Sequence, residues 1–117
     1  MKLTADWTPT QAEFDAFAAV SGDDNPIHVD ADFSARTRFG RTVAHGMLIY
    51  SRLWSLLGSA CPGLRQLRQE LMFPNPCYAG DPVQLSVESL APGRYAMRAA
   101  RKSDGAELLL GETEVAP

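Results

Sequence analysis

The sequence has no apolar run long enough to span a membrane and no cluster of basic residues. Its most apolar segment, His45–Gly58, has fourteen residues, whereas a membrane-spanning helix needs about twenty. The N-terminal MKLTADW lacks the apolar core of a secretion signal, so no leader is expected. A formal net charge of −3 without a basic stripe argues against nucleic-acid binding. We therefore expect neither a membrane nor a nucleic acid as partner.

Cysteine and histidine are scarce. Cys61 and Cys77 are the only two cysteines and form no CxxC pair, which together with the missing leader favours the reducing cytoplasm. His28 and His45 are the only imidazoles. No repeat, linker or low-complexity segment divides the 117 residues, of which 45% are hydrophobic. We expect a single cytoplasmic domain over residues 1–117.

Lysine is also rare, with two lysines against nine arginines. Arg36, Arg38 and Arg41 crowd one short segment. Guanidinium groups suit phosphates, although three neighbouring arginines are also typical of a solvated surface.

A short strand over residues 1–7 is expected to lead into a first helix. Thr8 can cap this helix, Pro9 fits its first position, and Gln11 can complete a capping box. Gly22 is expected to end it. This helix would deliver the chain directly into the segment that begins at Asp23.

Two further helices are predicted. Asp30 can cap a short helix through about Thr37, with Phe33 pointing inward. The segment His45–Gly58 has Arg52 as its only fixed charge and apolar residues on nearly every side. This pattern predicts a helix that is buried all round.

The C-terminal half has the alternating pattern of strands. The segments Gln69–Cys77, Pro82–Leu90, Arg94–Lys102 and Ala106–Val115 are separated by turn residues. Three successive strands after a buried helix predict an α+β fold, in which an antiparallel sheet curls around that helix.

The segment DDNPIH places two acids and an imidazole within six residues. Pro26 fixes its own φ and pushes Asn25 toward an extended conformation, so a loop is expected rather than a helix. A carboxylate from Asp23 or Asp24 beside His28 is a plausible proton-transfer pair. The alternative is that the acids solvate a turn and His28 fills a gap in the core.

The order of these motifs resembles the MaoC-like hydratases of the (R)-specific enoyl-CoA type, which have the hot-dog fold. The matching residues are Phe17-Ala18, Ser21-Gly22-Asp23, Asn25-Pro26-Ile27-His28, Asp30, Ala44-His45-Gly46-Met47, Gly80-Asp81 and Gly111-Glu112. The resemblance covers nearly the whole chain. It implies reversible addition of water to a trans-2-enoyl thioester of coenzyme A or acyl carrier protein, without metal or redox cofactor. It also implies a homodimer or a dimer of dimers.

In this reading Asp23 is the catalytic acid–base group and His28 holds the same water. Gly46 lies in the first turn of the apolar helix, where free amides could stabilise charge on the thioester oxygen. Asn25 and His45 are expected to brace the loop or the substrate.

Four residues of the apolar helix share one side of it and could wall the acyl tunnel, namely Met47, Tyr50, Trp54 and Leu57. Alternatively, this side packs on the sheet and the tunnel runs elsewhere.

Three alternative functions have sequence features that count against them. His28, Asp30 and His45 imitate the spacing of a two-histidine, one-carboxylate iron site, but the chain has no further histidine. A hot-dog acyl-CoA thioesterase would be expected to carry Asp or Glu on the central helix, and Gly46–Ala60 contains neither. A non-catalytic acyl-thioester-binding subunit would have no need of both Asp23 and His28.

Overall fold

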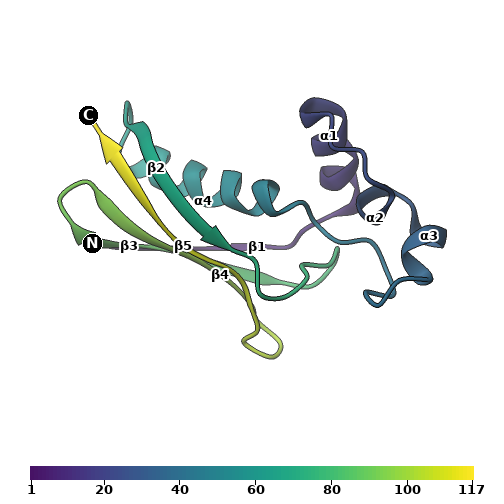
Figure 1. Ribbon diagram of the computed structural model, residues 1–117. Coiled ribbons are helices and arrows are strands. Elements are labelled where there is room, and N and C mark those ends of the chain that lie inside the picture. The colour runs from purple at the N-terminus through teal and green to yellow at the C-terminus, as the bar shows by residue number, and fades with distance from the viewer.

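The computed structural model describes all 117 residues and contains one five-stranded antiparallel sheet with four helices (Figure 1). The elements are β1 (Lys2–Trp7), α1 (Gln11–Ser21), α2 (Pro26–Val29), α3 (Ala31–Ala35), α4 (Gly46–Ala60), β2 (Arg65–Met72), β3 (Val83–Ala91), β4 (Arg94–Arg101) and β5 (Glu107–Ala116). The strand order is β1-β3-β4-β5-β2. Figure 1 shows α4 lying along the sheet, while α1, α2 and α3 gather beyond one end of it. The predicted α+β architecture is confirmed.

Strands β3, β4 and β5 form the predicted meander in the centre of the sheet. Val83, Leu85 and Val87 alternate with polar residues and are buried, and Met97 and Ala99 lie on the same inner side. The expected strand Gln69–Cys77 is wrong in its bounds, since β2 ends at Met72. The reason is that the two prolines which follow it, in the segment FPNP, cannot donate to a strand ladder.

The N-cap of α1 is Thr10, so the prediction that Thr8 caps this helix is wrong. The Thr10 side chain accepts from the Glu13 amide at 3.2 Å, and the Thr10 amide donates to the Glu13 carboxylate at 3.0 Å. Glu13, and not the expected Gln11, completes the capping box. Its carboxylate is held in place because it also accepts from the Trp7 indole at 3.2 Å and from Arg52 at 2.7 Å. Gly22 ends the helix with φ of 80°, as predicted.

The predicted loop at Pro26 is instead the one-turn helix α2. Pro26 occupies its first position, where a missing amide hydrogen costs nothing, and the Asn25 side chain caps it by accepting from the Ile27 amide at 3.2 Å. Asp30 caps α3 as predicted. The inward orientation predicted for Phe33 is wrong, because its side chain is exposed.

Helix α4 is buried on one side only, which corrects the expectation of burial all round. Leu48, Ile49, Leu53 and Leu57 face the sheet and form part of the core, whereas Met47 is exposed. The reason is that a single sheet covers one side of a helix, and the chain supplies no second layer over the other. No helix of the chain combines the length and the apolar character needed to cross a membrane.

Candidate active site

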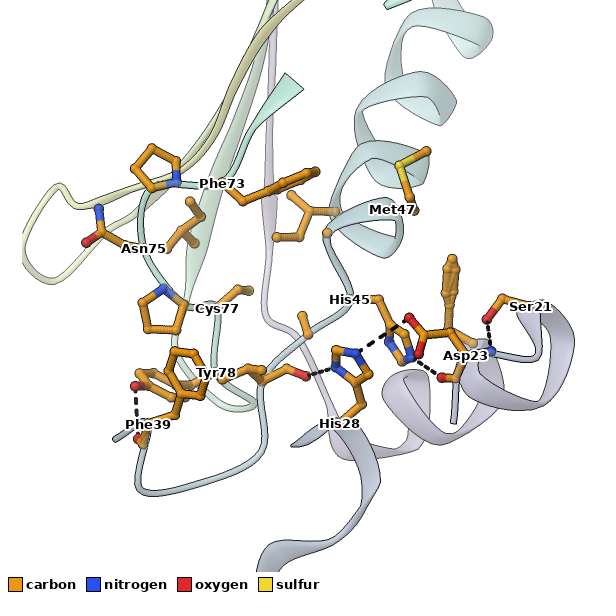
Figure 2. Close-up of a pocket in the computed structure, with 18 of the residues that line it drawn as sticks. Ser21, Asp23, His28, Phe39, His45, Met47, Phe73, Asn75, Cys77 and Tyr78 are labelled. Carbon is orange, nitrogen blue, oxygen red and sulfur yellow. Dashed lines mark hydrogen bonds and ion pairs between the residues drawn. The ribbon is translucent and has the colours of Figure 1, made fainter. Parts of the chain in front are cut away.

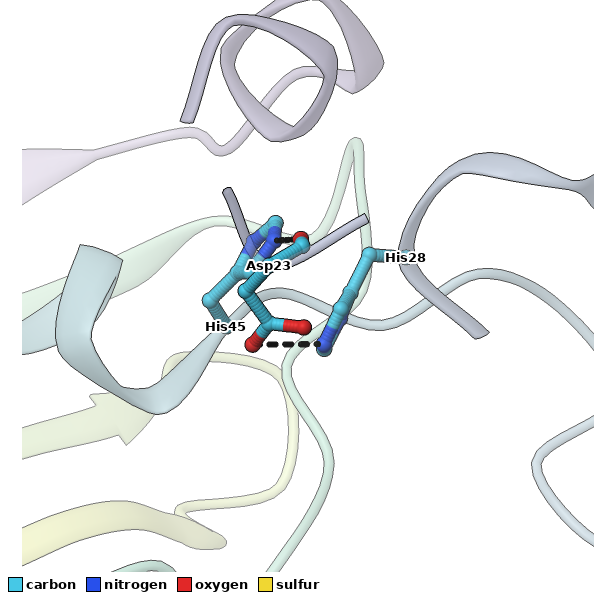
Figure 3. A group of neighbouring side chains, drawn as sticks. All are labelled: Asp23, His28 and His45. Atoms are coloured by element: carbon cyan, nitrogen blue, oxygen red, sulfur yellow. Dashed lines mark hydrogen bonds and ion pairs between the residues drawn. The ribbon is translucent and has the colours of Figure 1, made fainter. Parts of the chain in front are cut away.

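A cavity of about 760 Å³ lies between the end of α1, helix α2, the start of α4 and the segment that follows β2. Apolar side chains supply most of its wall. Figure 2 shows Phe73 and Met47 on one side of this space and His28 across from them. The side chains of Asp23, His28 and His45 lie next to one another at this cavity (Figure 3).

The ring of His28 is fixed by a main-chain carbonyl. Its Nδ1 lies 2.8 Å from the carbonyl oxygen of Val43. A carbonyl only accepts, so Nδ1 carries the hydrogen and, in the neutral ring, Nε2 offers its lone pair. Nε2 lies 3.7 Å from Oδ2 of Asp23. The His28 side chain is only 10% exposed, so α2 holds the basic nitrogen of a buried ring toward the carboxylate.

The carboxylate of Asp23 remains open to the cavity, since the side chain is 57% exposed. The Asp23 amide donates to Oγ of Ser21 at 3.1 Å, and Oδ1 accepts a long hydrogen bond of 3.5 Å from the Asn25 amide. These bonds direct Oδ2 toward His28. Asp24, the neighbouring acid, is exposed and does not line the cavity.

His45 contacts both Asp23 and His28. Its Nε2 donates to the main-chain carbonyl of Asp23 at 2.8 Å. Its ring stacks on that of His28 with centroids 3.7 Å apart and planes 21° apart, and Phe17 meets it edge-on. His45 therefore contacts the backbone of Asp23 and the ring of His28 at once.

Gly46 lies on the cavity wall at the first position of α4. Neither its amide nor that of Met47 has an acceptor in the chain, as is usual for the first turn of a helix. The ring of Phe73 packs against the Cα of Gly46. It lies so close that a Cβ on Gly46 would be only 2.6 Å from Cζ of Phe73. The glycine therefore allows close approach from the cavity side.

Asp30 of the alternative iron site caps α3 and lies outside the cluster of possible metal ligands. That cluster consists of Asp23, His28 and His45. Its ligand atoms lie within 4.8 Å of one another. However, the His28 and His45 rings stack with centroids 3.7 Å apart and planes 21° apart, so their lone pairs lie in two separate, nearly parallel planes. One ion cannot lie in both planes at the bond lengths that a transition metal needs. The arrangement does not fit the two-histidine, one-carboxylate site.

The other predicted site residues lie in different places. Met47 lines the cavity, whereas Asn25 does not and acts as the cap of α2. Tyr50 is buried in the core, where its hydroxyl bonds to Oγ1 of Thr113 at 2.8 Å and burial raises its pKa. Trp54 packs against the core and does not line the cavity. The alternative that this side of α4 packs on the sheet therefore describes Tyr50.

Several cavity residues were not foreseen from the sequence. Phe73, Leu108 and Tyr78 come from the segments after β2 and from β5, far from the acid–histidine motif in the chain. No periodic pattern marks them. The one available signal was the proline-rich segment FPNP, which interrupts the strand and lets residues 73–78 turn along the cavity.

Comparison with known proteins places these residues in a wider context. A family model described as "MaoC like domain" matches residues 1–107. The (R)-specific enoyl-CoA hydratase of Aeromonas caviae is 46% identical over 82 residues, which are 68% of this chain and 61% of that protein. The 3-hydroxybutyryl-CoA dehydratase of Methylorubrum extorquens is 40% identical over 88 residues, which are 72% of this chain and 56% of that protein. The chain thus spans little more than half the length of these curated relatives.

Solved structures agree with the sequence matches. The unliganded R-hydratase PhaJ1 of Pseudomonas aeruginosa has a TM-score of 0.88 and 32% identity, over 98% of this chain and 78% of that one. The (R)-hydratase of A. caviae, described as involved in PHA biosynthesis, has a TM-score of 0.89 and 36% identity, over 98% of this chain and 92% of that one. These likenesses confirm the predicted hot-dog fold.

Proposed function

We propose, from the premise that this chain belongs to the MaoC-like domain family, that it is a hydro-lyase acting on acyl thioesters. The reaction is the reversible addition of water to a trans-2-enoyl thioester to give the (R)-3-hydroxyacyl thioester. The names of the relatives support this activity. The observation that carries it is the carboxylate of Asp23 facing Nε2 of His28 across 3.7 Å at one cavity.

This gap suits one water molecule. An oxygen about 2.8 Å from both Oδ2 of Asp23 and Nε2 of His28 would make a hydrogen bond to each. Both atoms accept, so the water directs its two hydrogens at them and turns a lone pair toward the substrate. The tautomer imposed by the Val43 carbonyl is what makes His28 an acceptor here.

Proton transfer then follows from the geometry. As the water oxygen bonds to C3, Asp23 takes one of its protons and returns a proton to C2. One O–H bond of water and the C2=C3 π bond break, the C3–O and C2–H bonds form, and the carboxylate is regenerated. No electrons are lost or gained, so the reaction needs no redox cofactor.

Negative charge develops on the thioester oxygen during the attack. The amides of Gly46 and Met47 have no acceptor in the chain and lie at the positive end of α4, on the cavity wall. Amides fixed in this way stabilise such charge without reorganisation. Met47, Ile49 and Leu108 form apolar wall that an acyl chain would cover.

The test is a spectrophotometric assay of crotonyl-CoA hydration by the wild type and by Asp23→Asn and His28→Ala. Each variant is expected to lower kcat by about two orders of magnitude or more, the usual contribution of acid–base groups. Asp24→Asn is the matched control, since it removes a neighbouring exposed carboxylate outside the cavity, and it should retain full activity. Near-normal turnover by Asp23→Asn would refute the assignment. Release of free thiol instead of hydration would indicate a thioesterase.

We also propose that two copies assemble into a homodimer through β2. This strand is an edge of the sheet and leaves one row of backbone groups without partners. Leu67 and Met72 on it are exposed. Pairing of two such edges would bury these side chains and extend the sheet. The two free thiols, Cys61 and Cys77, are consistent with our proposal that the protein is located in the reducing cytoplasm.

A further inference from the structure

One arginine, Arg38, lines the cavity and is exposed to solvent. It follows α3, in the segment that leads toward α4. No other lysine or arginine lines the cavity, and Asp23 is the only carboxylate that does. The site therefore combines one reacting carboxylate with one permanent positive charge, which is exposed to solvent.

The guanidinium of Arg38 has no carboxylate partner. Most arginines of the chain do, with a nitrogen within 4.0 Å of an acidic oxygen, namely Arg41, Arg52, Arg68, Arg94, Arg98 and Arg101. Arg36 and Arg65 also lack one, but neither lines the cavity. Arg38 is thus the one unpaired arginine that a molecule in the cavity could meet.

The segment that carries Arg38 is held in place. Its guanidinium carbon lies 5.1 Å from the ring centroid of Phe39. The Phe39 carbonyl accepts from the hydroxyl of Tyr78 at 3.0 Å (Figure 2). The Phe39 amide donates to Oγ1 of Thr37 at 3.2 Å. A side chain on an anchored turn loses less freedom on binding than one on a loose loop.

We infer that Arg38 binds a phosphate on the carrier arm of the acyl thioester. This inference rests on the proposed function, because it concerns the other end of the same substrate. The thioester and the pantetheine next to it are neutral and give a guanidinium nothing to pair with. The phosphate that follows pantetheine, in coenzyme A and in acyl carrier protein alike, is anionic and matches the guanidinium fork. A chain with net charge −3 needs a local cation to hold such an anion.

The experiment compares thioesters with and without phosphate. Titration calorimetry of butyryl-CoA and butyryl-pantetheine, which lack the reactive double bond, measures binding alone. Arg38→Gln is expected to weaken butyryl-CoA binding by about tenfold or more, as for one charge-assisted contact, and to leave butyryl-pantetheine unchanged. Arg38→Lys should recover part of the loss because it restores the charge without the fork. Arg36→Gln removes an arginine two positions away, outside the cavity, and should bind both compounds like the wild type.

Kinetics separate this inference from the proposed function. With crotonyl-CoA, Arg38→Gln should raise KM about tenfold and leave kcat within about twofold, since the phosphate lies away from the reacting atoms. A wild type that binds butyryl-CoA more tightly than butyryl-pantetheine but hydrates nothing would refute the activity and leave the phosphate contact standing. Equal losses on both compounds, or no loss on butyryl-CoA, would refute the contact.

A third compound identifies the phosphate. If Arg38→Gln also weakens butyryl-4′-phosphopantetheine, Arg38 contacts the phosphate that both carriers share. If it weakens only butyryl-CoA, the contact is to a phosphate of the nucleotide, and coenzyme A is the carrier.

Discussion

Replacing Gly46 by alanine tests why a glycine begins α4. Two features of the structure could require a glycine here. The amide of Gly46 has no acceptor in the chain and would need a thioester oxygen to come close to it. The ring of Phe73 already packs against the Gly46 Cα, and a Cβ there would lie 2.6, 2.7 and 3.0 Å from three of its carbons. The first reason is catalytic and the second concerns packing alone.

The cost in stability should be small. Carbon atoms in contact prefer about 3.5–4.0 Å, so the Phe73 ring must retreat by about 1 Å. Such overpacking costs about 1–3 kcal/mol in a closed core, but Phe73 is 46% exposed and free to move toward the cavity. Alanine also gains up to about 1 kcal/mol of helix propensity over glycine. The free energy of unfolding should therefore change by less than about 1 kcal/mol.

The effect on catalysis should be large. The methyl group would stand between the Gly46 amide and the thioester oxygen, and loss of one such donor lowers kcat by about 10²–10³. Hydration of crotonyl-CoA is measured for Gly46→Ala, Phe73→Ala and the double variant, with urea unfolding of each. The double variant relieves the clash with the ring but keeps the methyl group. If it turns over substrate as fast as Phe73→Ala, glycine is needed only for the ring, which refutes the prediction that a methyl group blocks access to the amide.

Two further predictions concern assembly and pH. Light scattering should give twice the 12.7 kDa of one chain, and Leu67→Lys, on the β2 edge, should lower this to one chain, whereas Leu90→Lys, on β3, should not. A fully active monomer would contradict the proposed dimer. Burial raises the pKa of the Cys77 thiol from 9.0 to about 12, so between these values the unfolded chain loses a proton that the folded chain keeps. The free energy of unfolding should then fall by up to about 1.4 kcal/mol per pH unit, and Cys77→Ala should make this slope shallower. An unchanged slope would contradict it.

Local patterns predicted the parts of the fold that local physics decides. Val83, Leu85 and Val87 alternate on one strand, and a period of two needs no knowledge of the rest of the chain. The first turn of α1 could not be placed in this way. Thr8 and Thr10 are both acceptable caps by type, and Glu13 decides between them through its contacts with Trp7, which precedes the helix, and with Arg52 on α4.

The acid–histidine pair was predictable because Asp23 and His28 are close in the sequence and Pro26 restricts the chain between them. The detail that orients the pair was not. The carbonyl of Val43, which sets the tautomer of His28, lies fifteen positions away. Phe73 reaches Gly46 from the segment after β2. Such long-range contacts leave no periodic mark, so they come only from the folded chain.

The wrong expectation about α4 has a physical meaning of its own. Its sequence supplies apolar residues on nearly every side, but one sheet covers only the side of Leu53 and Leu57. The uncovered Met47 lies on the cavity wall, where an acyl chain would bury it. Here the helix has apolar side chains that no other part of the chain covers. Such a helix is expected where a ligand or a second copy of the chain buries the rest of its apolar surface. The excess apolar surface thus supports the acyl cavity independently of the acid–histidine pair.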